Sequence, residues 1–160
     1  MTHKEKAMAL FQEGYNCAQA VLCAFEDVTG LDRRVSLNIA ATFGGGLGRL
    51  REVCGTVSGA AMVLGMAYGG GEHTDTEIRK IHYARMQSFA EAFRQENGSY
   101  ICRDLLNAAS AVKHIDGKDN PAPEKRTNEY YKKRPCLQIV GTAADLLDRM
   151  LESEDPDAQK

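Results

Sequence analysis

Cysteine is the residue type in this sequence with the clearest capacity for chemistry. Five cysteines occur in 160 residues, at Cys17, Cys23, Cys54, Cys102 and Cys136. In a reducing compartment, cysteines serve as buried apolar residues, as ligands of a metal or cluster, or as catalytic redox thiols, and rarely as structural disulfides. The question of function is therefore first a question about these cysteines.

The spacing of the cysteines excludes the compact cysteine motifs. Thioredoxin-like dithiols, zinc fingers and zinc ribbons use closely spaced pairs, and this sequence has no C-x-x-C. Without Cys23, the separations are 37, 48 and 34 residues. A site that joins the other four cysteines must be assembled in the core, with each of four distant segments presenting one residue.

The composition and the hydrophobic pattern predict an all-α domain. Hydrophobic residues make up 43% of the chain and charged residues 26%, with a formal net charge of -2, which fits neither a disordered chain nor a nucleic-acid-binding domain. Alternation typical of strands does not persist, and good helix formers fill the periodic stretches. We expect residues 1–152 to form a single helical domain and residues 153–160 to form a disordered tail.

Membrane insertion and export are not expected from this sequence. It has no apolar run of about 18 residues, and its charged first six residues are not followed by the apolar core of a signal peptide. We therefore expect a cytoplasmic protein with no nucleic-acid partner, whose redox partner the sequence does not identify.

A bundle of about six helices around a central apolar helix is expected. The segment Gly55–Tyr68 is apolar nearly all round, which is typical of a helix buried in the middle of a domain and makes a homodimer a working hypothesis. The other main helical segments are expected at 2–13, after Asn16, at 74–95, after Ser99 and at 136–150. Residues 113–135 are polar and rich in turn formers, so we expect a surface excursion there.

Four of the five cysteines fall near the starts of these expected helices. Cys17 follows the capping residue Asn16, Cys54 precedes the apolar helix, Cys102 opens the short helix after Ser99, and Cys136 opens the last helix. Free backbone N–H groups and the helix dipole stabilise a thiolate at such positions, and the thiolate is both the nucleophile and the metal ligand. Burial as small apolar residues remains the alternative. Cys23 fits that alternative best, because it lies on a different face of its helix from Cys17.

Two polar residues and a glycine run are further candidates for a role near the cysteines. His82 and Arg85 interrupt the apolar stripe of the long helix 74–95. One interpretation is structural: His82 is a buried, hydrogen-bonded histidine, and Arg85 buries its aliphatic stem while its charge stays at the surface. The other is that both lie next to the cysteine site, where Arg85 would offset the negative charge of the thiolates or a cluster and His82 would transfer protons. The glycine run 44–48 lacks the signature of a phosphate-binding loop and is expected to be a turn that lets backbone approach closely before Cys54.

The pattern of cysteines and glycines resembles a known family. The segments that carry the resemblance are Gly14-Tyr15-Asn16-Cys17-Ala18-Gln19-Ala20-Val21, Gly44-Gly45-Gly46, Cys54-Gly55-Thr56-Val57-Ser58-Gly59-Ala60, and the isolated Cys102 and Cys136. They are similar to the redox-active C_GCAxxG_C_C family, which is named for its four cysteines. Thr56 stands where the family name has alanine, a change from one small residue to another.

The resemblance implies roles that the residues alone do not. It implies that Cys17, Cys54, Cys102 and Cys136 are the redox-active cysteines of a small helical protein, often encoded near transporter genes and without a settled substrate. A similar cysteine-bearing segment in split-Soret cytochromes implies an iron–sulfur centre. Whether the protein is an oxidoreductase enzyme stays open at this point.

Three hypotheses for function follow. The first is one metal or iron–sulfur centre on Cys17, Cys54, Cys102 and Cys136, a [2Fe–2S] cluster before zinc, used in electron transfer or redox sensing. The second is a metal-free thiol–disulfide oxidoreductase that uses the same cysteines. The third is a helical interaction module whose cysteines are only buried.

Overall fold

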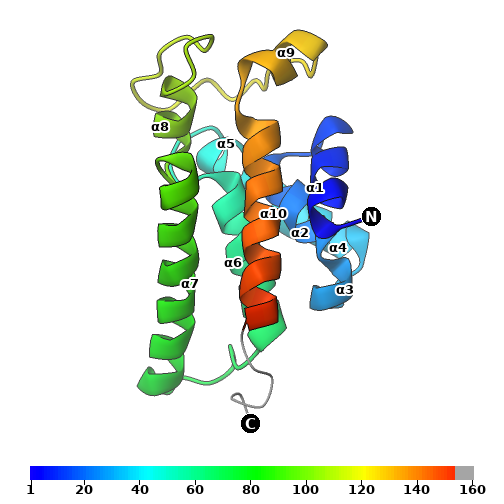
Figure 1. The fold of residues 1–160 in the computed structure, drawn as a ribbon, viewed down its shortest axis with the longest axis vertical. Helices are drawn as coiled ribbons and strands as arrows, with labels where there is room; N and C mark the ends of the chain where they lie inside the picture. Colours follow the sequence, from blue (N-terminus) through cyan, green and yellow to red (C-terminus); the bar gives the residue numbers. More distant parts are fainter. Residues whose placement is uncertain (154–160) are drawn as a thin grey trace.

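The computed structural model describes residues 1–153 and confirms the all-α fold (Figure 1). The elements are α1 His3–Gln12, α2 Cys17–Ala24, α3 Glu26–Thr29, α4 Arg33–Ala40, α5 Gly44–Leu47, α6 Gly55–Tyr68, α7 Thr76–Asn97, α8 Cys102–Asn107, α9 Asn128–Lys133 and α10 Cys136–Ser153. The six expected helices correspond to α1, α2, α6, α7, α8 and α10, and the structure adds α3, α4, α5 and α9. The tail was expected at 153–160: Ser153 is instead the last residue of α10, and residues 154–160 lie outside the described residues. No helix within 1–153 combines the length and apolar character needed to span a membrane.

Local capping explains where the first helices begin. Thr2 accepts a hydrogen bond from the Glu5 backbone N–H, and the Glu5 carboxylate accepts one from the Thr2 N–H, which closes a capping box. Asn16 and Gln19 form the same arrangement at the start of α2. These local hydrogen bonds fix the first residue of α2, and that residue is Cys17.

Helix α6 has the predicted bounds and packs against α2, α7 and α10. Close approach to α2 depends on small residues: a Cβ atom at Gly59 would lie 2.9 Å from the Ala18 carbonyl oxygen, and one at Gly55 would lie 3.1 Å from Cys17 Cβ. Only glycine leaves room for the backbone of α2 here. The packing of α2 on α6 therefore sets the spacing between the elements that carry Cys17 and Cys54.

The segment 113–135 differs from the expected surface excursion. It contains α9, which begins after the capping residue Thr127, and the rings of Tyr130 and Tyr131 pack half-buried against the core. The Tyr131 hydroxyl donates to the carbonyl oxygens of Phe11 and Gln12, 3.2 and 3.1 Å away. The polar composition of the segment hides these contacts, because they are made across the fold and have no local periodicity.

One end of the molecule gathers the short elements. The glycine-rich turn α5, the helices α8 and α9 and the start of α10 lie together at the top of Figure 1, whereas α7 runs the length of the molecule away from them. This end carries the cysteines described next.

Candidate functional site

Cys17, Cys54, Cys102 and Cys136 line one cavity of about 440 Å³, here called the cysteine cavity. Cys17, Cys102 and Cys136 are the first residues of α2, α8 and α10, and Cys54 is the capping residue of α6. The predicted position of all four at helix starts is confirmed. Each therefore lies near the positive end of a helix, which favours negative charge.

A short backbone pairing brings Cys54 and Cys102 together. Val53 and Ile101 form an isolated antiparallel bridge, the only β-type pairing in residues 1–153. The Cys54 N–H donates to the Tyr100 carbonyl at 2.9 Å, and the Cys102 N–H donates to the Glu52 carbonyl at 2.6 Å. The pairing joins the start of α6 to the start of α8, and no alternating pattern in the sequence predicts it.

Cys17 and Cys136 form a second pair. Their thiols interact by a hydrogen bond, which raises the pKa of Cys17 well above its usual value together with burial and the neighbouring cysteines. The same bond lowers the pKa of Cys136 to about 7, with help from the positive charges of Arg134, Arg126 and Arg51 and against the effect of burial. Cys136 is therefore the thiol of this pair that ionises first.

Burial dominates at the other two cavity thiols. It raises the pKa of Cys54 to about 12, although hydrogen bonds with Thr56 act in the opposite direction. It also raises the pKa of Cys102, against the hydrogen bond and charge of Arg51. In the metal-free protein near neutral pH, Cys54 and Cys102 are thus neutral thiols.

The glycine-rich turn forms a wall of the cavity through a left-handed backbone. Gly45, Gly46 and Gly48 have φ values of +68°, +69° and +57°. A Cβ atom at Gly46 would lie 2.6 Å from Cys102 Cβ and 2.8 Å from the Glu52 nitrogen. The expected close backbone approach is thus present, and its target is Cys102.

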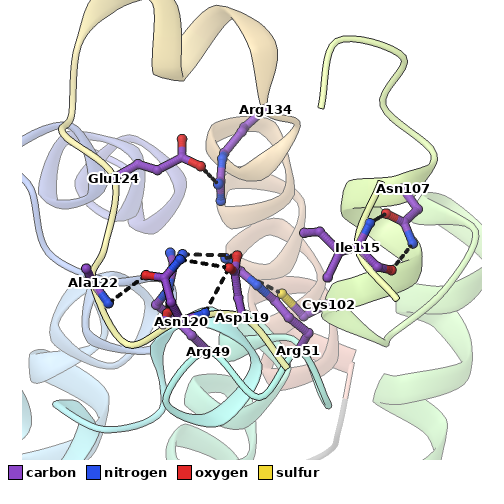
Figure 2. A network of polar contacts seen from close by, with 10 residues as sticks. All are labelled: Arg49, Arg51, Cys102, Asn107, Ile115, Asp119, Asn120, Ala122, Glu124 and Arg134. Atoms are coloured by element: carbon purple, nitrogen blue, oxygen red, sulfur yellow. Dashed lines mark hydrogen bonds and ion pairs between the residues drawn. The ribbon is translucent and has the colours of Figure 1, made fainter. Parts of the chain in front are cut away.

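Arg51 is the main site residue that the sequence did not reveal. Its side chain is only 2% exposed, and it lines the cysteine cavity with a φ of +61°. Figure 2 shows it between Cys102 and Asp119: one terminal nitrogen donates to the Cys102 sulfur at 3.6 Å and the other to the Asp119 carboxylate at 3.0 Å. Arginine is rarely buried unless it is paired, so the polarity pattern of the sequence assigns Arg51 to the surface. Its burial depends on partners that are distant in the sequence.

Two further arginines reach the cavity from the segment before α10. Arg134 is 8% exposed at its side chain and pairs with Glu124 at 2.8 Å (Figure 2). Arg126 donates to the carbonyl oxygens of Phe11 and Tyr15 at 3.0 and 3.2 Å. Both lower the pKa of Cys136, so the segment expected to be a surface excursion supplies charge to the site.

His82 and Arg85 lie elsewhere. They line a second cavity beside the glycine turn 69–71, where the Arg85 guanidinium carbon is 3.5 Å from the centre of the Tyr68 ring. Both residues are in the first half of α7, and Arg85 is about 18 Å along the axis from the helix end that leads to Cys102. The sequence pattern shows on which face of α7 these two residues lie. It does not show how far along the helix axis they are from the cysteines.

Cys23 is also outside the cysteine cavity, as expected. It is 2% exposed and lies in the core beside Glu26 and Arg33, and burial raises its pKa to about 11. It is the natural control residue for experiments on the other four.

Substitution of Asp119 tests how the arginines are held. Asp119 forms ion pairs with Arg49 and Arg51, both at 3.0 Å. Burial raises the pKa of its carboxyl group, but the two arginines and the Asn120 N–H together outweigh burial, so the pKa lies below its usual value. We expect Asp119→Asn to lower the free energy of unfolding by about 2 kcal/mol at pH 7, because two enclosed cations lose their carboxylate. Urea denaturation measures the change.

The Asp119 effect has a defined pH dependence and control. A carboxylate with a lowered folded pKa stabilises the fold above its unfolded pKa, and the contribution is lost as pH falls through the folded value. The difference between Asp119→Asn and the unsubstituted protein should therefore shrink below about pH 4. Asp116→Asn is the control, since Asp116 is 94% exposed and its loss should cost under about 0.5 kcal/mol. Equal effects of the two substitutions would contradict the assigned role.

Comparison with known proteins identifies one family. The family model described as "Putative redox-active protein (C_GCAxxG_C_C)" matches residues 15–150, which includes all four cysteines of the cavity. No curated protein and no solved structure gives a significant match. By its cysteine pattern over most of its length, the chain belongs to the C_GCAxxG_C_C family of redox-active proteins.

Proposed function

We propose that Cys17, Cys54, Cys102 and Cys136 hold a [2Fe–2S] cluster that serves in electron transfer or redox sensing. The observation that carries the proposal is the convergence of four single cysteines, from four helix starts, on one cavity. Four thiolates are the usual ligand set of such a cluster. When bound, the cluster would supply one-electron chemistry.

The charge around the cavity supports this ligand set. A cluster held by four thiolates carries net negative charge, and its potential depends on hydrogen bonds and nearby charge. The lining includes the side chains of Arg49, Arg51, Arg126 and Arg134 but only one carboxylate, Glu124. Arg51 donates to the Cys102 sulfur, so it would orient that ligand and offset its charge.

A [2Fe–2S] cluster would take its protein ligands as two pairs. Four thiolates around a [2Fe–2S] cluster are shared by two irons, so each iron needs two protein ligands, whereas zinc requires its ligands around one ion. In residues 1–153, no group of three or more His, Cys, Asp or Glu side chains is placed to hold one metal ion. Cys17 and Cys136, whose thiols interact, would hold one iron, and Cys54 and Cys102, next to the backbone pairing, would hold the other.

Spectroscopy of protein purified without oxygen tests the proposal. We expect absorbance between roughly 300 and 600 nm, together with about two irons and two sulfides per chain, because thiolate-to-iron coordination absorbs in that range. Neither thiols nor disulfides absorb there. Protein that stays colourless after reconstitution with iron and sulfide, while its circular dichroism shows the native helical content, would contradict a cluster.

A second candidate function has its own observation, the contact between the Cys17 and Cys136 thiols. As a thiol–disulfide oxidoreductase, the Cys136 thiolate would attack a substrate disulfide and release one thiol. The Cys17 sulfur, on loss of its proton, would then displace the second thiol and form a Cys17–Cys136 disulfide. Two electrons pass from the protein dithiol to the substrate disulfide.

Alkylation of the reduced, metal-free protein tests this second function. At pH 7, iodoacetamide should modify Cys136 at least about tenfold faster than Cys54, because only the thiolate reacts and their pKa values are about 7 and about 12. The difference should narrow as pH rises, since Cys54 then gains thiolate. Mass spectrometry of the labelled peptides measures the rates, and urea-unfolded protein, in which all five cysteines should react alike, is the control.

A further inference from the structure

The charges of this protein are separated between two parts of the fold. The cavity end, defined as residues 42–54 and 99–136, has ten Lys and Arg and six Asp and Glu, a formal charge of +4. The rest of the described chain has nine Lys and Arg and thirteen Asp and Glu, a formal charge of -4. The net charge of -2 for the whole sequence hides this polarity.

The excess positive charge at the cavity end is exposed and unpaired. Its five lysines are Lys113, Lys118, Lys125, Lys132 and Lys133, and all are exposed. None of them has a carboxylate of residues 1–153 within ion-pair distance, whereas Arg33, Arg94 and Arg149 elsewhere are paired with glutamates. The role of the buried arginines, which act on the cavity thiols, does not account for the lysines, because the lysine side chains are exposed to solvent.

The exposed lysines lie next to the cysteine cavity. Lys113, Lys125 and Lys133 line a neighbouring hollow that shares Glu124, Tyr130 and Arg134 with the cysteine cavity. A partner seated over this hollow would therefore lie beside the cysteines. Complementary charge speeds the encounter of such partners and orients them, which suits the small, transient interfaces of electron-transfer proteins.

We propose that the cavity end is the docking face for a redox protein with an acidic surface. This inference rests on the proposed redox function, because the purpose of docking would be electron transfer. Binding itself can be measured whether or not a cluster is present. An acidic protein fits better than a nucleic acid, because six carboxylates are interspersed among the basic residues and the whole sequence has a pI of about 6.1.

Binding of reduced and oxidised flavodoxin, an acidic redox protein, tests the docking face. The full chain should bind flavodoxin at low ionic strength, and the dissociation constant should rise about tenfold between 50 and 500 mM salt. In Lys125→Glu/Lys133→Glu, the constant should rise at least about tenfold at low salt. The control is Arg34→Glu/Lys80→Glu, which makes the same change in net charge at exposed positions outside the cavity end and should leave binding unchanged.

The other outcomes overturn the inference. Equal loss in the two double variants would reduce the effect to net charge, and equal binding of basic cytochrome c would remove the charge selectivity. Tighter binding of a twenty-nucleotide single-stranded DNA would assign the face to nucleic acid. Absorbance between 300 and 600 nm is recorded on the same samples. If the unsubstituted protein shows this absorbance but does not bind flavodoxin, only the docking inference is wrong. If it binds flavodoxin but lacks the absorbance, only the cluster proposal is wrong.

Discussion

Serine at Cys17, Cys54, Cys102 or Cys136 is expected to abolish or cripple iron binding and the absorbance between roughly 300 and 600 nm, whereas Cys23→Ser leaves both unchanged. The four cavity cysteines face one space, and a serine hydroxyl is a poor replacement for a soft thiolate ligand. Cys23 lies in a different part of the core. Iron and sulfide content per folded chain, measured without oxygen, gives the result directly.

The serine series also separates the two candidate functions. A thiol–disulfide oxidoreductase needs only the pair that exchanges, so Cys17→Ser and Cys136→Ser would lose activity while Cys54→Ser and Cys102→Ser kept it. A cluster requires both pairs. If Cys23→Ser behaved like Cys54→Ser, the assignment of the four cysteines to one site would be wrong. Circular dichroism of each variant ensures that only folded protein is compared.

Gly46→Ala is expected to lower the free energy of unfolding by about 3 to 5 kcal/mol. The added Cβ would lie under 3.0 Å from Cys102 Cβ, the Glu52 nitrogen and Arg51 Cα, and two of these are backbone atoms that cannot rotate away. Overpacking costs about 1 to 3 kcal/mol, and a left-handed non-glycine residue adds a similar amount. Urea denaturation measures the loss, and cluster loading should fall with it, because Cys102 must shift.

Gly48→Ala isolates the backbone contribution. Gly48 also has a positive φ, of +57°, but a Cβ there would meet only the Thr42 carbonyl oxygen, at 3.7 Å. We expect a loss of about 1 to 2 kcal/mol from the left-handed conformation alone. Leu47, Arg49 and Arg51 already adopt positive φ in this turn, so the strain by itself is tolerated. Equal effects at Gly46 and Gly48 would show that contact with Cys102 plays no part.

Local signals in the sequence were sufficient for six main helices and for the position of each cysteine on them, but not for α9. Asn16 with Gln19, and the all-apolar segment 55–68 bounded by glycines, depend only on hydrogen bonds and periodicity within a few residues. The placement of four cysteines at helix starts followed from these bounds. The exclusion of Cys23 followed from its different helix face.

Contacts between segments that are distant in the sequence could not be predicted from these local patterns. The bridge between Val53 and Ile101 is too short to leave an alternating pattern, yet it sets Cys54 beside Cys102. His82 and Arg85 were on an apolar face, but the register of α7 against the rest of the fold places them at another cavity. A helical wheel contains no information about that register.

The sequence by itself determined the helical fold, the starts of the main helices and the presence of a cysteine at each of four starts, because capping and amphipathic periodicity act between near neighbours in the chain. Tertiary structure alone decided how the cysteines pair, and which charges surround them. Arg51 meets Asp119 across 68 residues. Such a contact depends on how α6, α8 and the segment before α9 pack, and packing between distant segments leaves no local pattern in the sequence.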